Sequence, residues 1–514
     1  MDDKKVFLEQ LADNTNISFC DLEVEEISPE AIKLVNENLA RKHNVIPTRV
    51  EGNDLYLAMD DPLDFQAIDD VKLMSGKNIV PLLSTAQEIK IAIDQNYSGT
   101  EQAEKAVHEF NLDNKAKNEE KIDISLTDIE NAPIVRIVNS ILTDAVNMGA
   151  SDIHIEPFEK EVRIRMRIDG DLKELMQLPP ATLSGISTRI KIMSDLNIAE
   201  TKRPQDGRTK IKVGGKDINM RISFLPTVYG EKIVIRLLNK SSGIMDKSQI
   251  GFTPYNMAQI EKLMKISEGI ILLTGPTGSG KSTTLYSLLK DFNTIDKNIV
   301  TLEDPVEYQM FGVNQVQVNS EIGMTFASGL RSILRQDPDI IMLGEIRDEE
   351  TAQIAIRSAI TGHIVLSTLH TNDTVSSLSR LADMGIPKYM VTSAIAGVVA
   401  QRLLKRVCPK CAEKYRPSKQ EMEILGISEN TMLTRGRGCP FCGNTGYKGR
   451  IAIHEVLVLN RNIKNMVNAN CSNDEIKDQA CKEGMKTLEE SARELVLSGI
   501  TTVEEMIRAT YSVD

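Results

Sequence analysis

The sequence predicts a multidomain α/β protein whose largest domain is a three-layer αβα core. From about residue 241 onward, short apolar runs alternate with helical patterns and end in polar residues, as in an open α/β sheet. A glycine-rich loop at residues 275–283 lies between the apolar run 270–273 and a helical pattern. The chain has 514 residues, which is too long for one core, so three or four domains are expected.

The N-terminal part is expected to hold a small α+β module, a linker and a second α+β domain. Residues 1–98 contain a hairpin signal at Gly52-Asn53 but no catalytic spacing, so this module is interpreted as a docking or regulatory unit. Residues 99–126 are polar and charged and are interpreted as a linker. The second domain, residues 127–240, opens with an amphipathic helical pattern.

In the second domain, residues 162–168 alternate between apolar and arginine side chains. Arg163, Arg165 and Arg167 are therefore expected to share one face of a strand. Three interpretations of that face stay open: a solvated surface, a subunit contact or a nucleic-acid contact. The net charge of −12 makes nucleic acid the least favoured of the three.

The composition is that of a soluble globular protein, with 41% hydrophobic and 26% charged residues. No apolar run reaches the roughly 18 residues that a transmembrane helix needs. The longest candidate, residues 389–400, contains polar residues and is interpreted as a buried helix. Because no signal-peptide pattern follows the N-terminus, the protein is expected to stay in the cytoplasm.

The glycine-rich loop has the spacing of a phosphate-binding P-loop. Its glycines allow successive backbone N–H groups to point into one concavity, to which the following helix N-terminus adds partial positive charge. We expect Lys281 to reach the β- and γ-phosphates of a nucleoside triphosphate and Ser282 to ligate Mg²⁺. The expected nucleotide-binding residues are Gly275, Pro276, Thr277, Gly278, Ser279, Gly280, Lys281, Ser282 and Thr283.

Acidic side chains follow two other predicted strands. Glu345 follows the run 340–343, where a Walker B carboxylate belongs, and could order Mg²⁺ or activate the attacking water. Glu303, Asp304 and Glu307 follow the run 299–302. Four carboxylates beside one polyanion imply a cation, so Glu303 and Glu345 are expected to contribute to the Mg²⁺ site. A capped helix start after Pro305 stays open as an alternative for the second group.

Two histidines flank a fourth predicted strand, residues 364–367. His363 precedes it and His370 follows it, and either could donate to the γ-phosphate. The structural alternative, a histidine that only supports the fold, stays open for both residues.

Four of the seven cysteines form two C-x-x-C pairs, Cys408 with Cys411 and Cys439 with Cys442. Two such pairs can supply four thiolates to one tetrahedral Zn²⁺ ion, which leaves no open catalytic position. Redox-active disulfides are the less favoured alternative. We therefore expect a structural zinc segment at residues 405–450 in an ATPase domain of residues 241–514, which ends in helices.

In their order, these motifs resemble the secretion ATPase superfamily. The P-loop is followed by residues 303–307, similar to the family's Asp box, by residues 344–348, similar to Walker B, and by residues 367–372, similar to the His box. With the tetracysteine, this combination resembles the type IV pilus assembly ATPases and the type II secretion ATPases. The resemblance runs from about Ile129 to the C-terminus.

The second N-terminal domain also carries part of the resemblance. Residues 149–157 and the run Gln205-Asp206-Gly207-Arg208 are similar to motifs of that domain in the family. The resemblance extends more weakly to the first module, through residues 58–64. Some relatives bind cyclic di-GMP through tandem Arg-Leu-Gly-type repeats near the N-terminus, and no such motif stands in this chain.

The resemblance implies a RecA-like ATPase core that carries a zinc-binding insertion and follows a PAS-like second N-terminal domain. It implies a cytoplasmic homohexamer at the inner face of the cell membrane, with ATP, Mg²⁺ and Zn²⁺ as cofactors. Its implied partners are an inner-membrane platform protein and a cytoplasmic assembly protein, with no nucleic acid. It further implies that Arg208 and Arg221 complete the catalytic site and that hydrolysis drives pilin polymerisation.

Three other functions stay open at this point. A type II secretion pseudopilus ATPase would carry the same motifs. A RecA-like nucleic-acid motor would need basic or aromatic contacts to a strand, whereas aromatics make up 4% of this chain and tryptophan is absent. A nucleotide-gated scaffold that does not hydrolyse would need Lys281 but not Glu345.

Overall fold

The computed structural model describes residues 17–22, 25, 27–97, 133–213, 216–239, 244–428 and 430–510, and the expected linker lies outside these ranges. The chain divides into two compact units. The first comprises Met1–Ser241, Cys408–Cys411 and Arg437–Gly446. The second comprises Ser242–Val407, Ala412–Gly436 and Tyr447–Asp514. In the described ranges, no helix combines the length and the apolar character that crossing a bilayer requires.

The N-terminal module of the first unit is the expected α+β fold. Its sheet has the order β1-β2-β3, with β1 and β2 antiparallel and β2 and β3 parallel. The predicted hairpin is confirmed, because β1 ends at Glu51 and β2 begins at Asp54. The elements are α2 (Pro29–Ile32), α3 (Glu37–His43), β1 (Val45–Glu51), β2 (Asp54–Met59), α4 (Phe65–Ser75), β3 (Asn78–Leu83) and α5 (Ala86–Asn96).

The second domain of the first unit is a six-stranded antiparallel sheet with two long helices on one face. The strand order is β6-β5-β4-β9-β8-β7. Ile137 of α8 and Ile186 of α9 share one buried core with alternate residues of the strands. The elements are α8 (Pro133–Asn147), β4 (Asp152–Pro157), β5 (Val162–Ile168), β6 (Asp171–Leu178), α9 (Leu183–Met193), β7 (Gln205–Val213), β8 (Lys216–Thr227) and β9 (Gly230–Asn239).

The predicted arginine face of β5 is confirmed. Val162, Ile164 and Met166 are buried in the core, so the arginines between them point to the opposite face of the sheet. Each of the three lies beside a carboxylate of its own domain: Arg163 is 2.5 Å from Glu161, Arg165 is 2.7 Å from Glu156, and Arg167 is 3.9 Å from Asp152.

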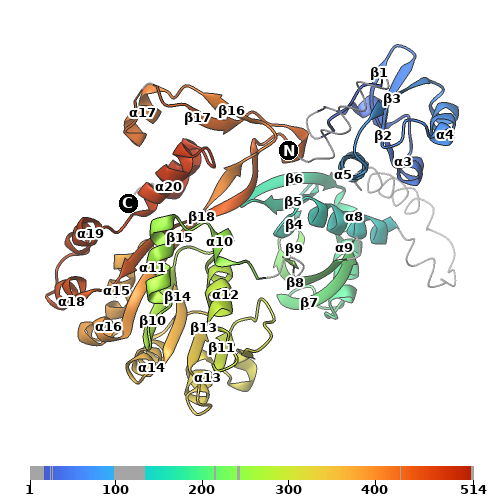
Figure 1. Cartoon of the computed structure of the whole chain (residues 1–514). Helices are drawn as coiled ribbons and strands as arrows, with labels where there is room; N and C mark the ends of the chain where they lie inside the picture. Colours follow the sequence, from blue (N-terminus) through green and yellow to red (C-terminus); the bar gives the residue numbers. More distant parts are fainter. Residues whose placement is uncertain are drawn as a thin grey trace. The chain divides into compact units, whose positions relative to one another are not determined.

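The second unit is the predicted αβα core (Figure 1). Its sheet has the order β12-β11-β13-β14-β10-β15-β18, parallel except where β18 pairs antiparallel with β15. Along β10, Ile270 and Leu272 belong to one hydrophobic core and Ile271 and Leu273 to another. The sheet therefore buries both faces, which explains why its strands read as unbroken apolar runs.

The strands of this sheet are β10 (Gly269–Thr274), β11 (Ile299–Glu303), β12 (Asn314–Gln317), β13 (Ile340–Leu343), β14 (Ile364–Leu369), β15 (Ile395–Val407) and β18 (Tyr447–Val458). A separate pair is formed by β16 (Ala412–Tyr415) and β17 (Leu433–Gly436). The helices are α10 (Lys247–Ile250), α11 (Pro254–Leu263), α12 (Lys281–Phe292), α13 (Phe326–Ile333), α14 (Glu349–Ile360), α15 (Thr374–Asp383), α16 (Lys388–Ala394), α17 (Lys419–Leu425), α18 (Arg461–Asn468), α19 (Asn473–Lys482), α20 (Leu488–Leu497) and α21 (Val503–Thr510).

The prediction of one buried helix over residues 389–400 was wrong. Helix α16 ends at Ala394, and β15 begins at Ile395 and runs between β10 and β18. The β-branched residues Ile395, Val398 and Val399 fill the sheet there. A short apolar run does not by itself distinguish a buried helix from a buried strand, and here the tertiary pairing decides.

Candidate nucleotide site and cysteine cluster

The glycine-rich loop joins β10 to α12, as the sequence predicts. All of β10 is buried, so the loop leaves the carboxyl edge of the sheet at a fixed place. Gly275 and Gly280 have φ values of 146° and 88°, in the region that favours glycine. A Cβ on Gly275 would lie 2.4 Å from the Gln401 carbonyl oxygen, and one on Gly280 would lie 2.8 Å from Gln401 Nε2. The loop therefore has no room for a side chain at either position.

A residue from another strand holds the loop in this shape. Gln401 of β15 is buried; its Nε2 donates to the Ser279 carbonyl oxygen at 2.8 Å, and its Oε1 accepts from Thr284 Oγ1 at 2.8 Å. The Lys281 Nζ donates to the carbonyl oxygens of Gly275 at 2.7 Å and Pro276 at 3.0 Å. Burial lowers the pKa of Lys281 to about 8.

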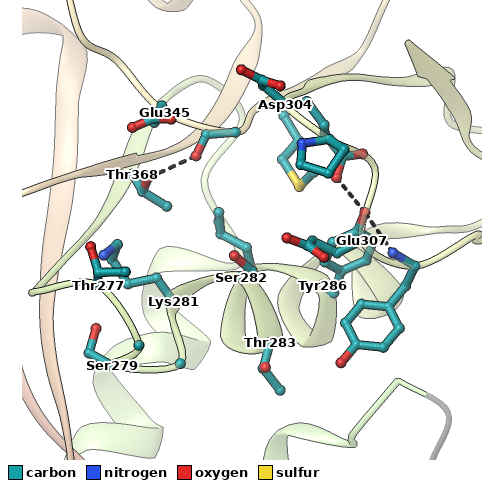
Figure 2. A pocket seen from close by; sticks show the side chains of 18 of the residues that line it. Thr277, Ser279, Lys281, Ser282, Thr283, Tyr286, Asp304, Glu307, Glu345 and Thr368 are labelled. Carbon is teal, nitrogen blue, oxygen red and sulfur yellow. Dashed lines mark hydrogen bonds between the residues drawn. The ribbon is translucent and has the colours of Figure 1, made fainter. Parts of the chain in front are cut away.

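The loop borders a cavity of about 410 Å³, and its lining comes entirely from the second unit. Figure 2 shows Ser282 and Tyr286 on α12, with Glu345 and Asp304, which lie on the loops after β13 and β11, across the cavity. The lining also includes Glu303, Glu307 and His370, which completes the set of predicted carboxylates. Hydroxyl and carboxylate oxygens are the donors that Mg²⁺ prefers, so these residues fit that ion.

Glu345 lies two residues after the end of β13 and is paired with two side chains. Its Oε1 lies 2.5 Å from Arg347 Nη2, and its Oε2 lies 3.3 Å from His370 Nε2. Burial alone would raise the pKa of Glu345, but the Arg347 guanidinium and His370 outweigh it and hold that pKa below its usual range. The carboxylate is therefore ionised at neutral pH, as a proton acceptor must be.

Glu303 is the last residue of β11 and is buried at the side of the same cavity. The alternative of a helix start after Pro305 is excluded, because residues 304–313 form a loop that leads into β12. Asp304 and Glu307 lie on that loop and line the cavity.

His363 does not belong to this site, so the prediction for it was wrong. It precedes β14, where its Nδ1 lies 2.9 Å from the Ser358 carbonyl oxygen, and it does not line the cavity. His370 follows the other end of β14 and does line the cavity. Six strand residues separate the two histidines, a span of roughly 20 Å, so one pocket cannot hold both.

Arg208 and Arg221 lie in the first unit, on neighbouring strands. They are direct cross-strand partners between β7 and β8, and Arg221 is in turn the partner of Arg236 on β9. Like charges directly opposite one another destabilise a sheet by roughly 0.2–1 kcal/mol. In this row, Arg236 is paired with Asp152 at 2.9 Å. Among the described residues, Arg221 has no ion-pair partner.

The four predicted cysteines form one buried cluster. Their sulfur atoms all lie within 4.8 Å of one another. The Sγ atoms of Cys408 and Cys439 are 3.8 Å apart, and those of Cys411 and Cys442 are 3.9 Å apart. A tetrahedral Zn²⁺ ion with Zn–S bonds of about 2.3 Å requires S–S distances of about 3.8 Å. The cluster therefore fits zinc, and its cysteines are not paired as disulfides.

Three residues of the site were not singled out from the sequence: Gln401, Tyr286 and Arg347. Gln401 follows the run 389–400, which was predicted to be a helix, so no strand was expected there and no signal pointed to it. Tyr286 lies one turn beyond Ser282 on α12 and lines the cavity. Arg347 stands two residues after Glu345, and this spacing could have indicated the ion pair.

Comparison with known families gives two matches. The family described as type II/IV secretion system protein matches residues 127–508, and the MshEN domain matches residues 15–103. The first match covers most of the chain, including the loop, the carboxylates and the cysteine cluster. The second covers the N-terminal module.

Named relatives match along nearly the whole chain. The chain is 44% identical over 501 residues to the type IV pilus assembly ATPase PilB of Thermus thermophilus, covering 96% of this chain but 56% of that protein's length. It is 43% identical over 496 residues to PilB of Myxococcus xanthus, covering 94% of this chain and 87% of that protein. It is 42% identical over 491 residues to the type II secretion system protein E of Xanthomonas campestris, and the match covers 94% of this chain and 86% of that protein.

Solved structures share the fold. The Legionella pneumophila ATPase DotB has a TM-score of 0.55 at 20% identity, covering 76% of this chain and 96% of that chain. The pilus retraction motor PilT, solved with bound ADP, has a TM-score of 0.51 at 27% identity, and the match covers 74% of this chain and 97% of that chain. Both likenesses support a RecA-like secretion-ATPase fold.

Proposed function

Because this chain belongs to the type II/IV secretion system protein family and is a P-loop ATPase, we propose that it is a motor that drives pilin polymerisation in type IV pilus assembly. The observation that carries the proposal is a cavity lined by the glycine-rich loop and the carboxylates, in a chain 43–44% identical to two pilus assembly ATPases over 94% or more of its length. The type II secretion pseudopilus remains the second candidate, because a type II secretion protein is 42% identical.

The cavity residues divide into binding and chemical roles in this proposal. Residues 275–283 cradle the triphosphate, with Lys281 at its β- and γ-phosphates. Ser282, Glu303 and Glu345 would hold Mg²⁺, which neutralises phosphate charge when bound. Glu345 orients and deprotonates the attacking water, and His370, which lies beside its carboxylate, contacts the γ-phosphate.

We further propose that the motor works as a cytoplasmic homohexamer at the inner face of the membrane. Its partners would be an inner-membrane platform protein and a cytoplasmic assembly protein. Support comes from Arg221 on β8, an exposed guanidinium that the sheet places directly between Arg208 on β7 and Arg236 on β9, where an anion brought by assembly would offset the repulsion between like charges. Arg208 and Arg221 are proposed as the arginines that complete the site.

Deleting the gene in the source organism tests the pilus assignment. The strain should lose surface pili, counted by electron microscopy, and keep the export of folded enzymes to the medium. The wild-type gene should restore pili, Lys281→Ala should not, and Lys290→Ala, an exposed lysine on the same helix, should restore them. Retained pili with lost enzyme export would assign the type II secretion role instead, and DNA-stimulated ATP hydrolysis by the purified protein would favour a nucleic-acid motor.

We propose Zn²⁺ as the ion of the cysteine cluster, with a structural role. The purified reduced protein should contain about one zinc ion per chain. Cys408→Ser should lower that content to near zero and make residues 405–450 sensitive to limited proteolysis, because the ion contributes folding energy to its segment. Cys471→Ser, outside the cluster, is the matched control. Full zinc content in Cys408→Ser, or none in the wild type, would contradict this role.

A further inference from the structure

A buried hydrogen-bond network surrounds Glu303 at the side of the nucleotide cavity. Glu303 and Tyr286 are 3% and 1% exposed, so neither can exchange its partners for bulk water. The Tyr286 hydroxyl donates to Glu303 Oε2. On the other oxygen, Oε1, Glu303 accepts from Thr301 Oγ1 at 2.6 Å and from Gln315 Nε2 at 3.2 Å. Both carboxylate oxygens are therefore fixed in direction.

The network follows from the register of the sheet. Thr301 and Glu303 are two residues apart on β11 and so share one face. Gln315 of β12 is the direct cross-strand partner of Thr301. That face packs against α12, because Ile299 of β11 belongs to the same core as Leu285 of α12. Three elements thus converge on one carboxylate.

Helix α12 links this network to the phosphate-binding loop. Tyr286 lies four residues after Ser282, so the two side chains occupy one face of the helix, one turn apart. Ser282, Tyr286 and Glu303 all line the cavity. Because a helical turn is rigid, the hydrogen bond from Tyr286 to Glu303 fixes where that carboxylate lies relative to the Ser282 hydroxyl.

We propose that Tyr286 is a positioning residue: its hydroxyl holds the Glu303 carboxylate in register with Ser282, so that the two oxygen donors proposed for Mg²⁺ keep a fixed separation. This inference rests on the proposed roles of Ser282 and Glu303. The hydrogen bonds that the described residues make to the Glu303 carboxylate all come from neutral donors, so no cationic side chain among them is paired with it. The carboxylate therefore has no competing cationic side chain among the described residues when a cation enters the cavity.

Two further features support the role of the hydroxyl. A phenol hydroxyl can donate, whereas a carboxylate can only accept, so this hydrogen bond runs from Tyr286 to Glu303. The aromatic ring has a separate task, since it packs edge-on against Tyr308 with ring centroids 5.3 Å apart. Phenylalanine would keep this packing and remove only the hydroxyl, which donates to Glu303 and accepts longer bonds from Tyr308 N at 3.4 Å and Gln315 Nε2 at 3.3 Å.

Tyr286→Phe therefore tests the inference directly. Its melting temperature should fall by only a few degrees, because one buried acceptor loses its donor, and its affinity for a fluorescent ADP analogue in EDTA should equal that of the wild type. Mg²⁺ should increase the affinity for the analogue, and the Mg²⁺ concentration that gives half of this increase should be about tenfold higher than in the wild type. The ATPase rate at saturating Mg²⁺ should be about tenfold lower. Tyr255→Phe, on α11 and away from the cavity lining, is the matched control and should change neither value.

A second variant keeps the inference testable if Tyr286→Phe is unstable. Thr301→Val removes the donor to the other oxygen of Glu303 at constant shape and should raise the Mg²⁺ requirement in the same direction. Thr301→Ser keeps the hydroxyl donor and should have the Mg²⁺ requirement of the wild type. A Mg²⁺ requirement in Tyr286→Phe and Thr301→Val equal to that of Tyr255→Phe would overturn the positioning role.

Glu303→Gln separates this inference from the proposed function. If Glu303→Gln raises the Mg²⁺ requirement and Tyr286→Phe does not, the metal role of Glu303 stands and the positioning role of Tyr286 is wrong. If Glu303→Gln leaves the requirement unchanged, the proposed metal role of Glu303 fails, and the inference about Tyr286 fails with it.

Discussion

Glu345→Gln should bind ATP about as tightly as the wild type and hydrolyse it at least about a hundredfold more slowly. The substitution keeps the shape of the side chain and removes its negative charge, so the attacking water loses its proton acceptor while the phosphate-binding loop is untouched. The amide also cannot form the ion pair with Arg347. Binding is measured with a fluorescent ATP analogue and turnover by phosphate release.

Lys281→Ala is the matched contrast, because it acts on binding itself. With a pKa of about 8, Lys281 is mostly protonated at pH 7 and can neutralise phosphate charge in the ground state. Its loss should weaken ATP binding as well as turnover. Wild-type turnover in Glu345→Gln would remove this residue from the chemistry, and wild-type affinity in Lys281→Ala would contradict the assignment of the cavity to the triphosphate.

Arg208→Ala and Glu345→Gln, each inactive alone, should regain turnover when mixed. If the arginine acts on the site of a neighbouring subunit, some interfaces in a mixed ring combine a wild-type Arg208 with a wild-type Glu345. Arginines that neutralise the charge developing on the γ-phosphoryl group increase the hydrolysis rate about 10³–10⁵-fold. Even a small share of such interfaces should therefore give detectable turnover. The wild-type rate should also rise more steeply than linearly with protein concentration as rings assemble.

Arg203→Ala is the control for this experiment. Arg203 is an exposed cation shortly before β7, paired with Glu200 at 3.9 Å, and its loss should leave turnover near the wild-type level. Subunit exchange is confirmed with labelled protomers. Linear concentration dependence and no rescue despite proven exchange would show that Arg208 acts within its own chain or only supports the sheet.

Local chemistry made several features readable from the sequence alone. The loop at residues 275–283 was predicted because its glycines and Lys281 are adjacent in the chain, and a strand and a helix must flank them. Four strands of the αβα core were predicted because strands buried on both faces read as unbroken apolar runs. The cysteine cluster was predicted because each C-x-x-C pair brings its two sulfur atoms together within one turn.

Only the tertiary structure decided which distant residues meet. It separated His363 from His370, because a strand carries its two ends to opposite edges of the sheet. It turned residues 395–400 into a strand, because β10 and β18 offer partners on both sides. It placed Gln401 beneath the loop and Tyr286 against Glu303, contacts that join residues 122 and 17 positions apart. Such contacts depend on strand order and register, which pairing between whole elements determines and no short stretch of sequence encodes.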